Sequence, residues 1–239
     1  MTDIAKTIGT AVGRDYSSVS AWESDLADTN IYASQDKAEG SCYADSEFNE
    51  NIYISGTFDL SGIVLTAAAS DRHDGTAGSG VLIKPSNTSA YALDIYESNV
   101  TASWIEINGN DSSPYGLQFG VGTTGGYVQN CLVHNFGSTS GASIDVYIIR
   151  NRASVNFTNN FIFNNTSGSS ADLFVHHSDS GVPSYLYNNT YYYNNVGDNL
   201  TNSGYIFYGT FADSASVAKN IVILRYDNNY WNIKHANAV

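Results

Sequence analysis

Asn159-Asn160-Phe161-Ile162-Phe163-Asn164-Asn165 shows the pattern that decides the fold: two asparagines, a short apolar run and two more asparagines. Related stretches elsewhere in the chain are Gln129-Asn130 before Cys131–Asn135, Asn188-Asn189 before Thr190–Asn195, and Asn228-Asn229 before Tyr230–Asn232. Anchored on the second residue of each leading pair, the steps are 30, 29 and 40 residues. Self-similarity at a spacing of about 20–50 residues indicates repeated units stacked on one another.

A second series of short apolar or aromatic runs alternates with the asparagine-bounded series. Its members are Ala90–Tyr96, Tyr115–Phe119, Ile144–Ile149, Asp172–Val175 and Tyr205–Tyr208. Each is followed by a member of the first series: Trp104–Ile107, Cys131–His134, Phe161–Phe163, Thr190–Tyr193 and Tyr230–Ile233. β-Branched and aromatic residues between Gly, Asn, Ser and Asp favour strands. Two series advancing in fixed order predict a coil whose repeats each hold at least two strands.

The N-terminal segment, residues 1–40, differs from the rest. From Ser17 to Ala27 the apolar residues Val19, Trp22 and Leu26 fall on one face of a helix. Ser17 or Ser20 is a candidate N-cap, and Ser20 with Glu23 fits a capping box. We therefore expect one domain, 1–239, with a short amphipathic helix within 1–40 and β-rungs over 41–239.

Asparagine also suggests how successive repeats are joined. Equivalent strands stacked in parallel lie about 4.7–4.9 Å apart, so identical side chains can form ladders. An asparagine amide both donates and accepts hydrogen bonds and can bridge repeats. The aligned positions predicted to form this ladder are Asn108, Asn135, Asn165 and Asn194. The aligned positions predicted to point inward are Ile105, Leu132, Ile162, Tyr191 and Trp231.

These patterns resemble the right-handed parallel β-helix of the pectin-lyase-like superfamily, which includes phage tailspikes and many polysaccharide-degrading enzymes. The segment Gly13–Glu23 resembles the amphipathic helix that caps the N-terminal end of such coils. The resemblance implies an all-β solenoid with a short capping helix. The family's polygalacturonase-like runs (Asn-Thr-Asp, Asp-Asp, Gly-His-Gly, Arg-Ile-Lys) and pectate-lyase-like runs are absent. It therefore supplies no catalytic residues.

Composition narrows the classes of partner. The chain carries a net charge of −13 with only 14 % charged residues, which argues against nucleic-acid binding and disfavours an electrostatic grip on acidic polysaccharides or anionic membranes. No run approaches the ~18–20 apolar residues of a membrane helix, and no secretory signal peptide is visible. Cys42 and Cys131 lie far apart and are either one disulfide or two buried thiols; the second is favoured.

Three polar clusters are candidate chemistry. Asp145 and Asp172 could stack on adjacent rungs as a carboxylate pair. Asp172, His176, His177 and Asp179 form a second cluster, but neighbouring histidines on a strand point to opposite faces and cannot share a metal. Asp71-Arg72-His73-Asp74-Gly75 is the third. Structural turns and hydrogen-bonded loops explain all three more readily, so no catalytic residue and no metal site is assigned.

Tyrosine is the abundant candidate for ligand binding, with 18 copies in the chain. Tyr185, Tyr187 and Tyr192 could form a flat platform, because a tyrosine ring packs on sugar C–H groups while its hydroxyl hydrogen-bonds. Aromatic ladders are also a common structural device of stacked strands, and this reading is favoured over the platform.

We therefore expect a virion structural protein: a β-helix spike or a capsid or tail decoration of a bacterial or archaeal virus, with a host surface glycan as its candidate ligand. Expected partners are two further copies in a homotrimer and other virion proteins, at the virion surface, with no cofactor, nucleic acid or membrane insertion. The alternative is a polysaccharide lyase or glycoside hydrolase that uses Asp145 and Asp172. The missing enzyme motifs favour the non-enzymatic hypothesis, although fold-level likeness is weak evidence for function.

Overall fold

The computed structural model describes residues 2–56, 58–137, 145–166, 173–179, 182–193, 204–209 and 216–225. The described strands form three sheets, and every pairing between named strands is parallel. Sheet A holds β1 (Asp3–Ile8), β2 (Lys37–Cys42), β5 (Gly62–Ala67), β8 (Val100–Ser103), β11 (Gly126–Gln129), β14 (Val155–Thr158), β17 (Ser184–Tyr187) and β20 (Val217–Lys219). Sheet B holds β3 (Phe48–Asn49), β6 (Leu82–Lys84), β9 (Glu106–Asn108), β12 (Leu132–His134), β15 (Phe161–Phe163), β18 (Thr190–Tyr193) and β21 (Val222–Arg225). Sheet C holds β4 (Ile52–Ile54), β7 (Leu93–Ile95), β10 (Tyr115–Phe119), β13 (Val146–Asn151), β16 (Leu173–Ser178) and β19 (Gly204–Gly209).

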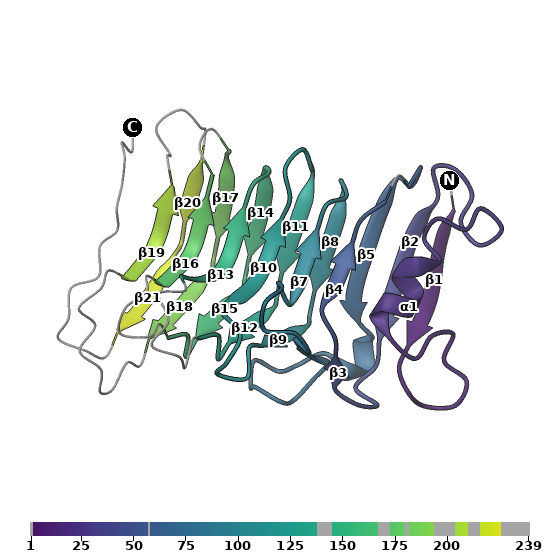
Figure 1. Cartoon of the computed structure of the whole chain (residues 1–239), viewed down its shortest axis with the longest axis horizontal. Helices are drawn as coiled ribbons and strands as arrows, with labels where there is room; N and C mark the ends of the chain where they lie inside the picture. Colours follow the sequence, from purple (N-terminus) through teal and green to yellow (C-terminus); the bar gives the residue numbers. More distant parts are fainter. Residues whose placement is uncertain are drawn as a thin grey trace.

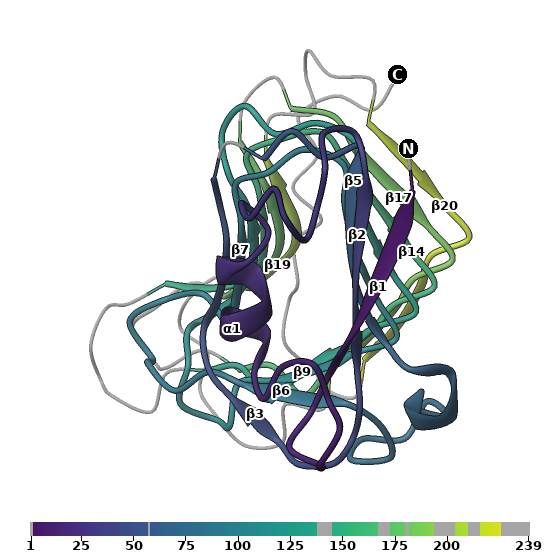
Figure 2. The ribbon, with the colours of Figure 1, turned by 90° about the vertical axis from the view of Figure 1, so that its right-hand side faces the viewer.

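From β2 onward the chain visits sheets A, B and C in turn, and we call each such set of three strands a rung. Successive rungs stack along the long axis of the molecule (Figure 1). Viewed along that axis, the three sheets surround a common interior (Figure 2). The order is compatible with a parallel β-helix-like solenoid. Both predicted strand series are present where described, as sheets B and C. Sheet A is a third series, of which the sequence predicts β5 (Gly62–Ala67), an apolar run between turn-forming residues.

The interior between the sheets is apolar. Strands alternate inward and outward residues, as in β2, whose alternate residues Ala38, Gly40 and Cys42 are buried. On sheet B the inward column is Ile107, Val133, Ile162 and Tyr191, paired in register and each no more than 1 % exposed. The predicted column was therefore out of register at Ile105 and Leu132, although both residues are buried. Trp231 lies outside the described residues.

The asparagine pairs form the corners between sheets A and B. The first residue of each corner is an asparagine with a left-handed backbone, with φ of 55° at Asn130, 58° at Asn159, 55° at Asn188 and 54° at Asn220, while the predicted pair Asn228-Asn229 lies outside the described residues. Asparagine tolerates this conformation better than other non-glycine residues. The strand register makes these four residues equivalent. The repeat steps are therefore 29, 29 and 32 residues, and anchoring on the second residue of each pair was wrong by one position at Asn130.

The second asparagine of the pair points inward and joins the rungs. Asn160 is 2 % exposed and Asn189 is fully buried. Oδ1 of Asn160 accepts a 2.9 Å bond from the Cys131 backbone N–H, and its Nδ2 donates to Val128 O at 3.0 Å and to Asn189 Oδ1 at 3.0 Å. These bonds cross between rungs, so the asparagines satisfy backbone groups that the corner leaves unpaired.

The predicted asparagine ladder is also out of register. Asn108 pairs with His134 rather than with Asn135, and Asn135 has a left-handed backbone with φ of 56°. Asn165 is 3 % exposed, and its Oδ1 accepts a 2.9 Å bond from the Phe136 backbone N–H. Asn194 lies outside the described residues. Thus Asn165 bridges rungs, but the four residues are not one column.

A short helix, α1 (Val19–Ser24), lies at the N-terminal end of the stack in contact with β1, β2 and β4 (Figures 1 and 2). Val19 and Trp22 are buried, as the helical periodicity predicted. The N-cap is Ser18, whose Oγ accepts from Ala21 N at 3.1 Å. The predicted caps Ser17 and Ser20 were therefore wrong. Glu50, in the β3–β4 connection, accepts hydrogen bonds from the Val19 and Ser20 N–H groups at 2.9 and 3.0 Å. A 3-10 turn, η1, spans Ala69–Asp71.

Both cysteines lie within the described residues. Cys42 and Cys131 are free buried thiols, as the favoured alternative predicted. Burial raises the pKa of both, that of Cys131 to about 12, so neither is an activated nucleophile. No helix in the described part of the chain has the length and apolarity to cross a membrane.

Candidate functional site

The outer face of sheet C carries a row of polar and aromatic side chains. Its central row consists of residues paired across successive strands: Tyr53, Asp94, Gln118, Arg150 and His177. The flanking residues Leu93, Ile95 and Leu117 are buried, which places Asp94 on the outside by strand alternation. We call this outer surface the sheet C face.

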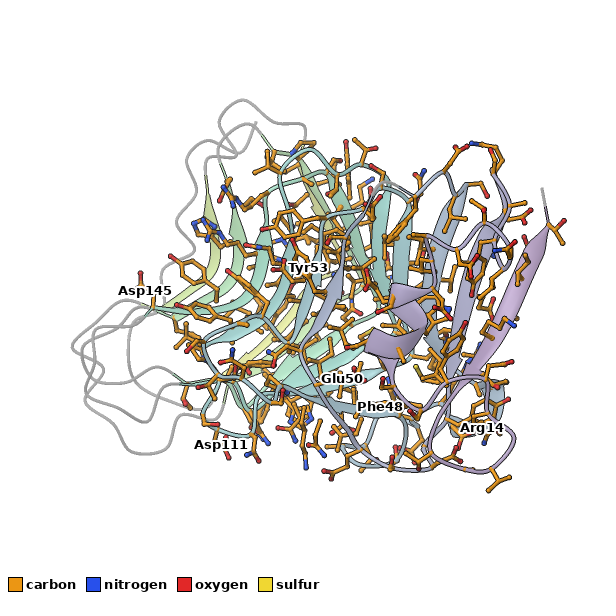
Figure 3. All side chains as sticks on the ribbon, turned by 45° about the vertical axis from the view of Figure 1, so that its right-hand side comes forward. Arg14, Phe48, Glu50, Tyr53, Asp111 and Asp145 are labelled. Atoms are coloured by element: carbon orange, nitrogen blue, oxygen red, sulfur yellow. The ribbon has the colours of Figure 1, made fainter. Side chains whose placement is uncertain are left out.

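One end of the face is built around two exposed tyrosines. Tyr53 on β4 is 53 % exposed and Tyr96, just after β7, is 37 % exposed; their ring centroids lie 5.5 Å apart with planes tilted by 56°. Tyr53 is labelled in Figure 3. Because the two rings meet at an angle, parts of both remain open to a ligand.

Beside these rings, the side-chain amide of Gln118 holds the carboxylate of Asp94 in place. Gln118 Nε2 donates to Asp94 Oδ1 at 2.9 Å and to Tyr96 Oη at 3.1 Å. Gln118 is 4 % exposed and is therefore fixed, whereas Asp94 is half-buried. Burial raises the pKa of the Asp94 carboxyl, and the bond from Gln118 opposes this effect. The arrangement presents a carboxylate, an amide and a hydroxyl within one hydrogen-bonded group.

The middle of the face is a stack of tyrosines. Ring centroids of Tyr91 and Tyr115 lie 5.2 Å apart, and those of Tyr115 and Tyr147 lie 6.4 Å apart with planes inclined by only 17°. Burial raises the pKa of Tyr91 to about 12. The rings pack against one another, so these three tyrosines form a structural ladder rather than an open platform for a sugar.

The far end of the face is cationic. Arg150 and Arg152 on and after β13 approach the same carboxylate, Asp179, with Nε–Oδ distances of 3.7 and 3.0 Å. His177 Nδ1 lies 3.5 Å from Asp179 Oδ1. Burial lowers the pKa of His177 and the Asp179 charge opposes this, so its imidazole is mainly neutral at pH 7.

The predicted tyrosine platform falls elsewhere. Tyr185 and Tyr187 lie on β17 in sheet A, on one side of the buried Leu186, while Tyr192 lies on β18 in sheet B. The corner at Asn188-Asn189 separates the two strands, and all three rings are half-buried. Nothing in the geometry tests their role in binding, which stays a prediction.

The predicted acid pair is only half described. Asp145 directly precedes β13 at the cationic end of the face and is labelled in Figure 3; its Oδ2 lies 3.5 Å from Tyr147 Oη. Asp172 lies outside the described residues. The pair therefore stays a prediction, and the carboxylates that the described structure places on this face are Asp94, Asp145 and Asp179.

The two histidines of the second predicted cluster do separate. His176 points inward and is fully buried, with its Nε2 2.8 Å from Asn151 Nδ2, while His177 points outward. Burial lowers the pKa of His176 to about 3. Among the described residues, no three His, Cys, Asp or Glu side chains are grouped as metal ligands.

The third predicted cluster is a hydrogen-bonded loop over sheet B. Asp74 Oδ1 accepts from Thr76 N and Ser79 Oγ, both at 2.9 Å. Beneath the loop the sequence reading missed a buried pair: Glu106 Oε1 lies 2.8 Å from His134 Nε2, and Oε2 accepts from Gly78 N at 2.6 Å. Burial alone would raise the pKa of Glu106, but these hydrogen bonds lower it. Both side chains are only 1–2 % exposed, and the hydrogen bond from Gly78 N attaches the loop to Glu106.

The sequence reading also missed the sheet C face, although it found the strands that carry it. The outward residues Asp94, Gln118 and Arg150 are 24 and 32 residues apart, so no fixed repeat reveals them. Aligning the second strand series by its buried leucines and isoleucines would have placed them in one row.

No family model, curated protein or solved structure matches this chain.

Proposed function

We propose that this protein binds a glycan along the sheet C face. The observation that carries the proposal is the exposed Tyr53–Tyr96 pair next to the Asp94–Gln118–Tyr96 hydrogen-bonded group. Aromatic rings pack on the C–H faces of sugars, and a carboxylate held in place accepts hydrogen bonds from sugar hydroxyls. The Arg150–Arg152–Asp179 group extends the same polar row by further rungs.

Several rungs contribute to this row, so the ligand is an oligosaccharide rather than a single sugar. The row from β4 to β16 crosses five strands, and the four spacings of about 4.8 Å between them give roughly 19 Å. The side chains there are set on strands rather than loops, which fixes their spacing and limits the conformational entropy lost on binding.

The wider role we propose is a spike or decoration protein of a bacterial or archaeal virion, folded as a right-handed parallel β-helix whose α1 covers the N-terminal end. What supports it is the resemblance of the repeats, the absence of the family's enzyme motifs and a face suited to a host surface glycan. A homotrimer is part of this proposal. Light scattering should then give three times the 25.8 kDa chain mass, and a monomer would contradict the trimer.

Glycan binding is tested by screening wild type on an array of bacterial and archaeal surface oligosaccharides. Tyr53→Ala and Tyr96→Ala should each weaken the best ligand about tenfold. Tyr127→Ala is the matched control, because Tyr127 is 47 % exposed but lies on sheet A. Loss of binding in Tyr187→Ala with none in Tyr53→Ala would move the site to the tyrosines first predicted. Release of reducing ends or unsaturated sugars from the ligand would favour the enzyme alternative.

A further inference from the structure

The connection between β5 and β6 folds back on itself as a loop over the outer face of sheet B (Figure 2). Its ends meet where the Val81 N–H donates to the Asp71 carbonyl at 3.2 Å. Residues 71–81 therefore form an Ω-loop, a class of compact surface loop that often carries function. We call this loop the strap.

Glu106 and Trp104 contact the strap from the sheet side. The Gly78 N–H donates to Glu106 Oε2 at 2.6 Å. At the corner before β9, the Trp104 ring lies next to two side chains of the strap. The guanidinium carbon of Arg72 is 5.1 Å from the centre of this ring, and the imidazole centre of His73 is 5.8 Å from it.

Trp104 occupies a corner position that asparagine fills in the later rungs. By strand register it is equivalent to Asn130, and its backbone is left-handed with φ of 59°. This conformation is rare for a bulky side chain and persists only where the surrounding structure holds it. Here Arg72 and His73 of the strap pack against the ring. The corner is therefore built to hold the strap.

His73 is enclosed between the strap and the sheet, with only 7 % of its surface exposed. Burial disfavours a charged imidazole and lowers the pKa of His73 below 6.5. A hydrogen bond to the Asn130 main chain and the charges of Glu106 and Asp74 oppose this effect without cancelling it. The cation Arg72 lies over the same indole ring. His73 therefore binds a proton more tightly when the strap is open than when it is closed.

We infer that residues 71–81 form an acid-released strap, which covers the Glu106–His134 pair at neutral pH and opens when His73 takes up a proton. This inference goes beyond the proposed glycan binding, because the strap lies over sheet B rather than on the sheet C face. Opening uncovers the Glu106 carboxylate and the Trp104 ring, so this part of sheet B becomes an accessible surface only in acid.

The direction of the pH dependence follows from the burial of His73. The closed strap is fully stable above about pH 6.5 and loses stability as the pH falls through that value towards the lower pKa of the buried imidazole. Burial raises the pKa of Glu106, but hydrogen bonds from His134 and Gly78 lower it below 4.5. Glu106 therefore keeps its charge to more acidic pH, and the first opening step belongs to His73.

Hydrogen exchange of the Gly78 amide, measured by NMR and corrected for the intrinsic rate at each pH, reports how often the strap opens. In wild type we expect the protection of this amide to fall at least about fivefold between about pH 7.5 and pH 5. The Leu132 amide, which donates to Ile105 O within the rungs, should keep its protection. His73→Phe keeps a ring beside Trp104 but does not titrate, so the protection of Gly78 should then change less than about twofold.

Two further variants identify the groups involved. Glu106→Gln keeps an acceptor for His134 but places an amino group opposite the Gly78 N–H, so Gly78 should be weakly protected at both pH values. His176→Gln removes a buried histidine of sheet C, and its strap should respond to pH as in wild type.

Equal protection of Gly78 at the two pH values in wild type would overturn the inference, as would an unchanged pH dependence in His73→Phe. Loss of protection at Leu132 together with Gly78 would show unfolding of the rungs instead of release of the strap, and would also overturn it. The wild-type comparison and Glu106→Gln decide the matter if His73→Phe fails to fold. None of these outcomes depends on glycan binding at the sheet C face, which the glycan array tests separately.

Discussion

The side-chain amide of Asn160 donates a 3.0 Å hydrogen bond to Oδ1 of Asn189, its equivalent one rung further along the chain. The same Oδ1 accepts the Asn160 backbone N–H at 2.9 Å, and Asn189 Nδ2 continues to Phe157 O at 2.9 Å. Each asparagine thus serves the backbone of the preceding rung, and the side chains hold the corners together where the strand ladders end.

Asn160→Ala should lower the free energy of unfolding by about 2–3 kcal/mol, because it leaves buried backbone groups of Cys131 and Val128 without partners. Asn159→Gly is the matched control one residue away. Asn159 is exposed with φ of 58°, a conformation glycine adopts freely, so its replacement should cost less than about 1 kcal/mol. Urea denaturation measures both values, and equal losses would contradict the inward ladder.

Glu106→Ala should lower the free energy of unfolding by about 3 kcal/mol, because it removes the buried partner of both the His134 imidazole and the Gly78 N–H. Glu47→Ala provides the comparison: its pair with Lys84 has the same 2.8 Å separation, but Glu47 is 49 % exposed. That variant should change stability by less than about 0.5 kcal/mol. Similar effects on thermal unfolding would show that burial does not set the strength of these pairs.

His176 should make the protein less stable in acid. Its pKa is about 3 in the folded protein and near 6.5 when unfolded, so the unfolded state binds the extra proton first. Stability is complete above the unfolded value and falls as the pH drops from about 6.5 towards 3, by on the order of 3 kcal/mol at pH 4. Urea unfolding at pH 7 and pH 4.5 measures this contribution. His176→Gln keeps a hydrogen-bonding group but does not titrate, so an unchanged pH dependence in that variant would contradict the assignment.

Gly116→Ala should disrupt the pairing of β10 with β13. A Cβ at Gly116 would lie 2.2 Å from the Ile148 carbonyl oxygen, and backbone there cannot move without shifting Arg150. We expect the free energy of unfolding, measured by urea denaturation, to fall by at least about 2 kcal/mol. In Gly62→Ala the new Cβ would lie 3.5 Å from its nearest neighbour, an ordinary contact, so that strand glycine should tolerate the change.

The sequence predicts the class of fold because buried strand residues and corner asparagines recur at nearly constant spacing. It misses sheet A beyond β5 because strands such as Val155–Thr158 and Ser184–Tyr187 are short and half polar, and directly precede the asparagine pairs. The register error arises because Asn130 is the left-handed member of its pair, followed by Cys131 rather than by a second asparagine. Only the backbone conformation distinguishes the two members.

The sheet C face is harder to predict, because outward-facing residues are not constrained to repeat. Gln118 and Arg150 become neighbours through strand pairing, but the connections between rungs differ in length and hide their alignment. Net charge likewise does not report local arrangements, such as the pairing of Arg150 and Arg152 with Asp179.

The regular order of strands through the three sheets fixes the spacing of side chains along the sheet C face. Tyr53 lies on β4 and Arg150 on β13, three strand spacings apart, and each spacing is set by main-chain hydrogen bonding. Inserting or deleting one whole rung between them would keep every corner and core contact type while changing that separation by about 4.8 Å. The number of rungs, rather than the identity of any side chain, therefore sets the distance along the sheet C face between Tyr53 and Arg150.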